Sequence, residues 1–163
     1  MLWTFFWILA ALVLLFAFVL LFGAPYLPTL KKQSDAALDL LDLKPGQTLL
    51  ELGCGDGRVL KVAAKQGLNA IGYELNPVLV AISLLNTWKY RKQVKIVWGN
   101  FWTKEWPKAD GIFVFLHTRF MSKLDKKIKK YKHKPLKVIS YTYKIPSKNY
   151  LKRGQGLYLY KYR

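Results

Sequence analysis

Apolar and polar positions follow two different periods along the 163 residues of the chain. Short apolar runs bounded by glycine, proline or polar residues predict buried strands, and apolar stripes with helical spacing between these runs predict helices. Strands that alternate with helices predict an α/β fold with a Rossmann-like, doubly wound, mostly parallel sheet. The predicted strands are residues 49–52, 69–74, 94–98, 110–116, 136–141 and 157–162, the last of them at an edge of the sheet.

The boundaries of three predicted helices can be read from capping residues. Ser34 is expected to cap a short helix that carries Ala37, Leu38 and Leu41 on one face. Gly67 stands where a left-handed residue ends the helix that begins at residue 58. Asn76 followed by proline is typical of a helix start, and this helix is expected to reach about residue 91. A further stripe, Leu124, Ile128 and Tyr131, predicts a lysine-rich helix.

The amino-terminal pattern is different. Residues 3–22 are apolar except for Thr4 and carry no charge, which is long enough to cross a hydrocarbon core at ~1.5 Å per residue. No Lys or Arg precedes this run and it is too long for a signal peptide, so it predicts a retained transmembrane helix before the domain. We therefore expect a transmembrane anchor at 1–24, a juxtamembrane segment with a short helix at 25–47, and the catalytic domain at 48–163.

Charge adds an orientation and a set of partners. The net charge is +18, and all 27 Lys and Arg residues follow the apolar run. The positive-inside rule then predicts a single-pass membrane protein with a cytoplasmic domain, in a bacterial inner membrane by preference and a mitochondrial inner membrane second. Residues 119–163 hold fifteen basic residues against one acid, which favours anionic lipid headgroups over nucleic acid as the partner of an anchored domain. A solvated lysine-rich surface explains the same charge equally well.

The candidate chemistry lies in residues 49–58, Leu-Leu-Glu-Leu-Gly-Cys-Gly-Asp-Gly-Arg, where a strand enters a glycine loop that opens a helix. Glycines allow a ligand to approach the backbone closely, and the helix start offers free N–H groups. The Gly-x-Gly-x-Gly spacing differs from the Gly-x-Gly-x-x-Gly of dinucleotide sites. Glu74 ends the next strand, where a carboxylate can accept both hydroxyls of a ribose.

These features resemble motif I and the acidic residue of the class I S-adenosylmethionine-dependent methyltransferases, so the implied cofactor is S-adenosyl-L-methionine. Cys54, the only cysteine, is expected to be a small packing residue in the loop, without a disulfide or a metal cluster. The resemblance implies cofactor-binding roles for Glu51, Gly53, Cys54, Gly55, Asp56, Gly57, Glu74, Leu75, Asn100 and Phe101.

A narrower resemblance follows from the order of the motifs. An apolar span, the Pro-Tyr-x-Pro of residues 25–28, motif I and the Gly-Tyr-Glu-Leu-Asn-Pro of residues 72–77 are similar to the membrane-anchored protein-lysine methyltransferases whose mitochondrial members modify the ATP synthase c-subunit and the adenine nucleotide translocase. This likeness implies a lysine of a membrane protein as the acceptor. The chain departs from the family at Asn100, where the family usually has Asp, and at residues 142–144, where Thr-Tyr-Lys replaces Arg-Phe-Pro.

Methylation of a lysine requires a neutral amine, whose reference pKa is about 10.4, and burial against aromatic rings lowers that pKa. Trp102, Tyr141 and Tyr143 are candidates for such walls because they follow the carboxyl ends of strands, although each also fits a packing role. His117 is a candidate general base with an alternative structural role. A lipid or small amphipathic acceptor stays open, as does a non-catalytic, basic, membrane-bound module that binds nucleic acid, against which the intact Glu51 and Glu74 argue.

Overall fold

A computed structural model describes residues 3–11, 13 and 27–163. Residues 3–11 and residue 13 are helical. Within the described residues no helix combines the length and apolar character needed to cross a membrane. The predicted transmembrane helix before the domain, and the single-pass membrane location derived from it, are therefore wrong. The rest of that predicted span, residues 12 and 14–22, lies outside the described residues, and the three-part division of the chain stays a prediction.

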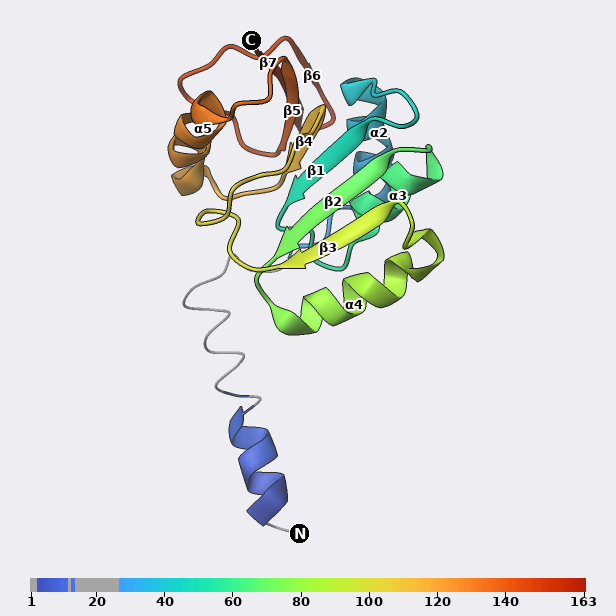
Figure 1. The fold of residues 1–163 in the computed structure, drawn as a ribbon. Coiled ribbons are helices and arrows are strands. Elements are labelled where there is room, and N and C mark those ends of the chain that lie inside the picture. The colour runs from blue at the N-terminus through green and yellow to red at the C-terminus, as the bar shows by residue number, and fades with distance from the viewer. Residues whose placement is uncertain (1–2, 12, 14–26) are drawn as a thin grey trace.

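The domain is built on a mixed sheet in the order β3-β2-β1-β4-β5-β7-β6 (Figure 1). The first five strands of this order run parallel, as predicted, whereas β7 is antiparallel to both of its neighbours. The chain order reverses between β1 and β4, and the crevice outside the carboxyl ends of the strands at such a point is where ligands bind in open α/β sheets. The strands are β1 Thr48–Leu52, β2 Asn69–Glu74, β3 Val94–Trp98, β4 Gly111–Val114, β5 Leu136–Tyr141, β6 Lys152–Gly154 and β7 Leu157–Tyr162.

The last strand is not at the edge of the sheet, contrary to the sequence-based expectation. The short β6 pairs with the outer side of β7, and all three of its residues are exposed. Four consecutive residues of β7, from Leu157 to Tyr160, are buried, which is the pattern of a strand covered on both faces. The three exposed residues of β6 carry too little apolar signal to be recognised as a strand from the sequence.

Helices cover both faces of this sheet (Figure 1), so the doubly wound prediction is correct. On one face α2 and α3 share a core with β1, β4 and β5, and α4 lies beside α3; α5 packs on the other face. The helices of the domain are α2 Lys31–Leu41, α3 Arg58–Lys65, α4 Pro77–Thr87 and α5 Met121–Lys130, with short 3₁₀ turns η1 Trp88–Tyr90 and η2 Thr118–Phe120.

Two of the three predicted helix-capping residues are confirmed. Asn76 caps α4 as expected, because its side chain accepts the N–H of Val78 at 2.9 Å, and Gly67 has the expected positive φ of 79°. Ser34 does not cap α2, which begins at Lys31; its buried hydroxyl lies inside the helix and donates to the Leu30 carbonyl at 3.2 Å. Helix α4 ends at Thr87 and continues only as the 3₁₀ turn η1.

Candidate functional site

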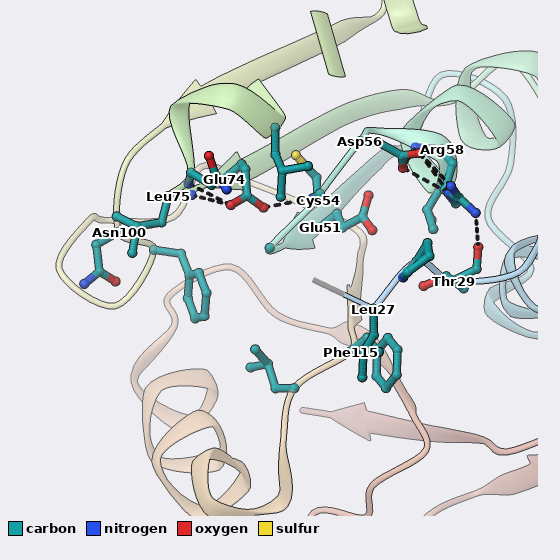
Figure 2. Close-up of a pocket in the computed structure, with 18 of the residues that line it drawn as sticks. Leu27, Thr29, Glu51, Cys54, Asp56, Arg58, Glu74, Leu75, Asn100 and Phe115 are labelled. Carbon is teal, nitrogen blue, oxygen red and sulfur yellow. Dashed lines mark hydrogen bonds and ion pairs between the residues drawn. The ribbon is translucent and has the colours of Figure 1, made fainter. Parts of the chain in front are cut away.

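A cavity opens at the carboxyl ends of β1, β2 and β4, where the strand order reverses (Figure 2). Its described lining comes from the glycine loop, the ends of β2 and β4, the loop after β3 and the segment that precedes α2. These residues are Leu27, Pro28, Thr29, Glu51, Gly53, Cys54, Gly55, Asp56, Arg58, Val59, Glu74, Leu75, Asn76, Leu79, Asn100, Phe101, Trp102, Phe115, Leu116 and Phe120.

The glycine loop is fixed by its backbone and by close packing beneath it. The N–H groups of Gly53 and Cys54 both donate to the Tyr73 carbonyl, at 2.9 and 2.8 Å. Gly53 has a φ of +88°, which favours glycine, and apart from its chain neighbours no described residue has an atom within 4 Å of the position of a Cβ built there. The loop therefore presents bare backbone to the cavity. Gly57 faces the protein instead, since a Cβ there would lie 3.0 Å from that of Ser83 in α4.

Glu74, at the tip of β2, links the glycine loop to the start of α4 (Figure 2). One carboxylate oxygen accepts the N–H of Gly55 at 2.9 Å, and the other accepts the N–H groups of Leu75 and Asn76, each at 2.8 Å. A carboxylate has about four acceptor positions, so these three bonds leave room for a further donor from a ligand. The arrangement holds the carboxylate where the ribose role was predicted, and that role stays a prediction.

Glu51 is the most unusual group in the cavity. Its side chain is only 4% exposed, and its Oε2 atom has no hydrogen-bond partner among the described residues. Burial raises the pKa of this carboxyl well above its ordinary value, and the nearby charges of Asp56 and Glu74 act in the same direction. Because an unpaired buried acceptor costs ~1–3 kcal/mol, this atom fits a site that is completed by a cationic or hydrogen-donating ligand.

Asp56 and Arg58 connect the loop to a segment that the sequence-based site did not include. The Arg58 guanidinium pairs with Asp56 at 2.7 Å and donates to the carbonyl of Thr29 at 3.2 Å (Figure 2). This contact accompanies residues 27–29 in the lining of the cavity, to which Phe115 also belongs. The two partners of this contact lie in or next to sequence motifs that were recognised, the Pro-Tyr-x-Pro stretch and the arginine that ends motif I.

Phe101, Trp102 and Phe120 form an aromatic wall in the lining of the cavity. The rings of Phe101 and Trp102 lie 4.6 Å apart between centroids, and Phe120 lies 6.0 Å from Trp102. The Lys123 ammonium already sits 4.6 Å above the Trp102 ring, a cation–π contact. Asn100 supports this wall, because its side-chain oxygen accepts the N–H of Trp102 at 2.9 Å.

The other predicted residues divide into two groups. Every predicted cofactor residue except Gly57 lines the cavity, whereas Trp102 is the only predicted catalytic residue in the described lining. Tyr141 packs behind the cavity against Phe115, with ring centroids 4.6 Å apart. His117 is exposed; its Nδ1 accepts the N–H of Arg119 at 3.4 Å and its ring lies 5.4 Å from that of Tyr143.

Cys54 lies in the loop with little space around its side chain. It is 4% exposed, and a Cβ built on Gly72 would lie 2.7 Å from its sulfur atom. Burial is the largest cause that raises the pKa of the thiol far above its ordinary value. The charges of Glu51 and Glu74 raise this pKa further. A thiol held neutral in this way is a poor nucleophile, so the cysteine contributes size and shape to the loop.

Several lining residues were not predicted as site residues, although the elements that contain or adjoin them were predicted. Their common signal is position, at or after the carboxyl end of a parallel strand or the start of the following helix. They are Val59, Asn76, Leu79, Phe115, Leu116 and Phe120.

The parallel sheet with this strand order, the glycine loop after β1 and the acidic tip of β2 define a Rossmann-like methyltransferase fold. An RNA methyltransferase from Salinibacter ruber, solved in complex with S-adenosyl-L-homocysteine, has the same fold with a TM-score of 0.77. The similarity covers 83% of this chain and 93% of that one at 22% sequence identity, so it shows the fold alone.

Residues 51–152 match the model of the ANTKMT methyltransferase domain, and the chain belongs to that family. It is 30% identical to the ATP synthase c-subunit lysine N-methyltransferase of Homo sapiens over 75% of this chain and 53% of that protein. It is also 30% identical to a protein-lysine N-methyltransferase of Saccharolobus islandicus, over 74% of this chain and 78% of that one. The chain thus spans about half the length of the human relative.

The cofactor of this family is S-adenosylmethionine, and the cavity suits it. Three of the nine acidic residues of this strongly basic chain line the cavity: Glu51, Asp56 and Glu74. They offer negative charge and acceptors to a molecule that carries a sulfonium, an ammonium and two ribose hydroxyls. The bare backbone at Gly53 leaves open space, and Phe101 and Leu75 are apolar residues of the same lining.

Proposed function

We propose that the chain transfers a methyl group from S-adenosylmethionine to the side-chain amine of a lysine in a protein. The observation that carries this proposal is a single cavity lined both by the glycine loop with Glu51 and Glu74 and by the aromatic wall of Phe101, Trp102 and Phe120. The protein-lysine N-methyltransferases among the relatives support the same reaction.

When bound, S-adenosylmethionine supplies a methyl group on a sulfonium, and the lysine nitrogen displaces it in line, forming an N–C bond as the S–C bond breaks and S-adenosylhomocysteine leaves. The chain has to position the two partners and exclude water. Glu51 and Glu74 would hold the cofactor's polar groups, and Trp102 would contact the acceptor lysine.

A lysine amine must lose a proton before it can attack. Desolvation in the cavity disfavours the ammonium and so lowers the pKa of the acceptor. His117 is exposed and lies away from the lining, so we assign deprotonation to desolvation and to release of the proton to water.

The narrower proposal concerns the acceptor protein. Relatives are named for methylation of the ATP synthase c-subunit in Homo sapiens and of the adenine nucleotide translocase in Mus musculus. These names support a lysine of a membrane protein as the acceptor of this chain as well. The Tyr143 region, where the chain departs from its family, is the part in which a different acceptor would be selected.

The test is transfer of labelled methyl groups from S-adenosylmethionine by the full chain to a membrane fraction, with proteins and lipids separated afterwards and lysines examined by mass spectrometry. Glu74→Gln removes the charge from a carboxylate that accepts three backbone N–H groups, and we expect a cofactor affinity about 10- to 100-fold lower by calorimetric titration. Glu105→Gln is the matched control, since it removes an equal charge from an exposed position.

The outcomes separate the proposal from its alternatives. Label on protein lysines that depends on Glu74 supports it. Label that enters lipid or a small amphipathic molecule contradicts the lysine acceptor and leaves the cofactor assignment intact. Failure of the chain to bind the cofactor, with equal behaviour of both variants, would favour a non-catalytic module.

A further inference from the structure

Helix α4 turns its large apolar side chains to the outside of the domain. The helix contains no charged residue, yet Leu85 is 76% exposed and Val78 is 47% exposed. Trp88, which follows directly in the turn η1, is 64% exposed. A helix on the surface of a globular domain ordinarily directs such residues to the core. The outer face of α4 comprises Val78, Ala81, Ile82, Leu84, Leu85 and Trp88.

The inner face of α4 explains this reversal. Ser83 and Thr87 are its buried residues, and their hydroxyls donate within the helix to the carbonyls of Val80 and Ser83, at 2.8 and 2.7 Å. They pack on Gly57 so closely that a Cβ there would lie 3.0 Å from the Cβ of Ser83 and 3.2 Å from a methyl of Thr87. Only small side chains fit between the helix and the glycine loop, so the large ones point outward.

Tryptophans and basic residues border this face. Trp98 is 65% exposed at the end of β3, and its indole N–H donates to the Leu75 carbonyl at 3.1 Å beside the start of α4. At the other end the Arg91 guanidinium lies 5.0 Å from the centre of the Trp88 ring. Lys89, Arg91, Lys92 and Lys95 are exposed nearby, and the sequence contains no acidic residue from 75 to 104.

We propose that the outer face of α4 docks on the surface of a lipid bilayer that contains anionic headgroups. In this arrangement the helix lies along the interface, with Leu85 and Val78 at the acyl boundary and the basic border against the headgroups. The face favours lipid over a protein partner, because protein interfaces surround an apolar centre with hydrogen-bonding groups. Asn86, the amide on this helix, is already directed to the Asp56 carbonyl at 2.9 Å.

The docking surface adjoins the cofactor cavity. Asn76 and Leu79, at the start of α4, line that cavity, while Val78 between them belongs to the outer face. Docking would therefore bring the cavity to the bilayer surface. The contact is peripheral and does not depend on residues 3–22 or on methyl transfer.

The test places an environment-sensitive fluorophore at Leu85→Cys in the full chain and adds vesicles of phosphatidylcholine and phosphatidylglycerol with brominated acyl chains. The native Cys54 thiol is buried and unreactive, so labelling is selective. Fluorescence at this position is the readout, because the apolar amino-terminal residues can contribute to vesicle binding on their own. Lys126→Cys, exposed on α5 across the sheet, is the matched control.

We expect quenching by brominated lipid and shielding from aqueous iodide at position 85, and neither at position 126. Equal quenching at both positions, or no quenching at 85, overturns the proposal. Shielding that requires an added membrane protein and occurs without lipid quenching also overturns it, in favour of a protein partner.

Charge reversals test the basic border. Lys89→Glu, Arg91→Glu and Lys92→Glu together should raise the amount of anionic lipid needed for half-maximal quenching at position 85 by about tenfold or more. The same number of reversals at Lys126, Lys130 and Lys132, which are also exposed, is the control for net charge. An equal effect of both sets would show that total charge governs the contact and would contradict docking through α4.

Discussion

At the scale of single residues, Glu51 shows how the site depends on its ligand. The carboxyl is buried, and one of its oxygens has no hydrogen-bond partner among the described residues. Burial is the main cause that raises its pKa, and the charges of Asp56 and Glu74 raise it further. A carboxyl with a raised pKa in the fold destabilises the protein as the pH rises through that pKa, because the unfolded state ionises more easily. A cationic cofactor reverses this preference by stabilising the carboxylate.

We therefore predict that cofactor affinity increases as the pH rises above the ordinary carboxyl value of about 4.3, by up to about tenfold per unit while Glu51 must lose a proton on binding. Calorimetric titration in buffers of different ionisation enthalpy should detect the released proton. Glu51→Gln should bind more weakly and lose the pH dependence, while Glu105→Gln should keep it. A pH profile that is unchanged in Glu51→Gln would refute this account.

At the scale of elements, α5 fixes the loop that carries the aromatic wall. The Lys127 ammonium donates to the carbonyls of Trp102 and Lys104, at 2.8 and 2.9 Å, and lies 5.0 Å from the centre of the Trp106 ring. Burial is the main cause that lowers the pKa of this lysine, and the charge of Lys123 lowers it further. One side chain thus connects a helix on one face of the sheet to the loop after β3 that borders the cavity.

Lys127→Met should release this loop while keeping most of the apolar length of the side chain. Two hydrogen bonds from a charged donor are lost, so we expect the free energy of unfolding to fall by about 1.5–3 kcal/mol and methyl transfer to fall by about tenfold. Thermal unfolding and the initial rate of transfer measure these effects. Lys126→Met, one position away on the exposed side of α5, should leave both unchanged. Equal losses in the two variants would argue against a role of the loop contact.

At the scale of the whole molecule, Asp125 holds three parts of the chain together. Its buried carboxylate pairs with Lys129 of α5 at 2.6 Å and accepts hydrogen bonds from Ser147, after β5, at 2.6 Å and from Tyr162 of β7 at 2.7 Å. Burial alone would raise the pKa of Asp125, but the hydrogen bonds from Lys129, Ser147 and Tyr162 outweigh it, so the pKa is lowered. The only acid in the basic carboxy-terminal region is therefore a structural centre.

A lowered carboxyl pKa stabilises the fold above the unfolded value of about 3.9, and this contribution disappears as the pH falls through the lowered pKa. Asp125→Asn should unfold about 4–8 °C below the parent chain at neutral pH, equivalent to about 2 kcal/mol, and the difference should shrink toward pH 2. Circular dichroism melts over this range provide the measurement. Asp39→Asn at an exposed position of α2 is the control. A difference that does not vary with pH would show that charge is not the cause.

The sequence by itself determined the elements with strong local signals. Strand β5 was predicted with its observed bounds, and Asn76 with its following proline located the start of α4, because strand periodicity and capping are properties of neighbouring residues. Motif I and Glu74 indicated the cofactor class for the same reason, since their spacing along the chain reflects one strand–loop–helix unit and the next strand.

Tertiary structure decided the features that depend on residues far apart in the sequence. The addition of β6 outside β7 and the entry of residues 27–29 into the cavity both rest on contacts over long separations, the second through Arg58 and the Thr29 carbonyl. The unpaired oxygen of Glu51 and the outward face of α4 arise from burial and close packing around the glycine loop. Hydropathy of residues 3–22 predicted a transmembrane helix, whereas no helix within the described residues is long and apolar enough to cross a membrane.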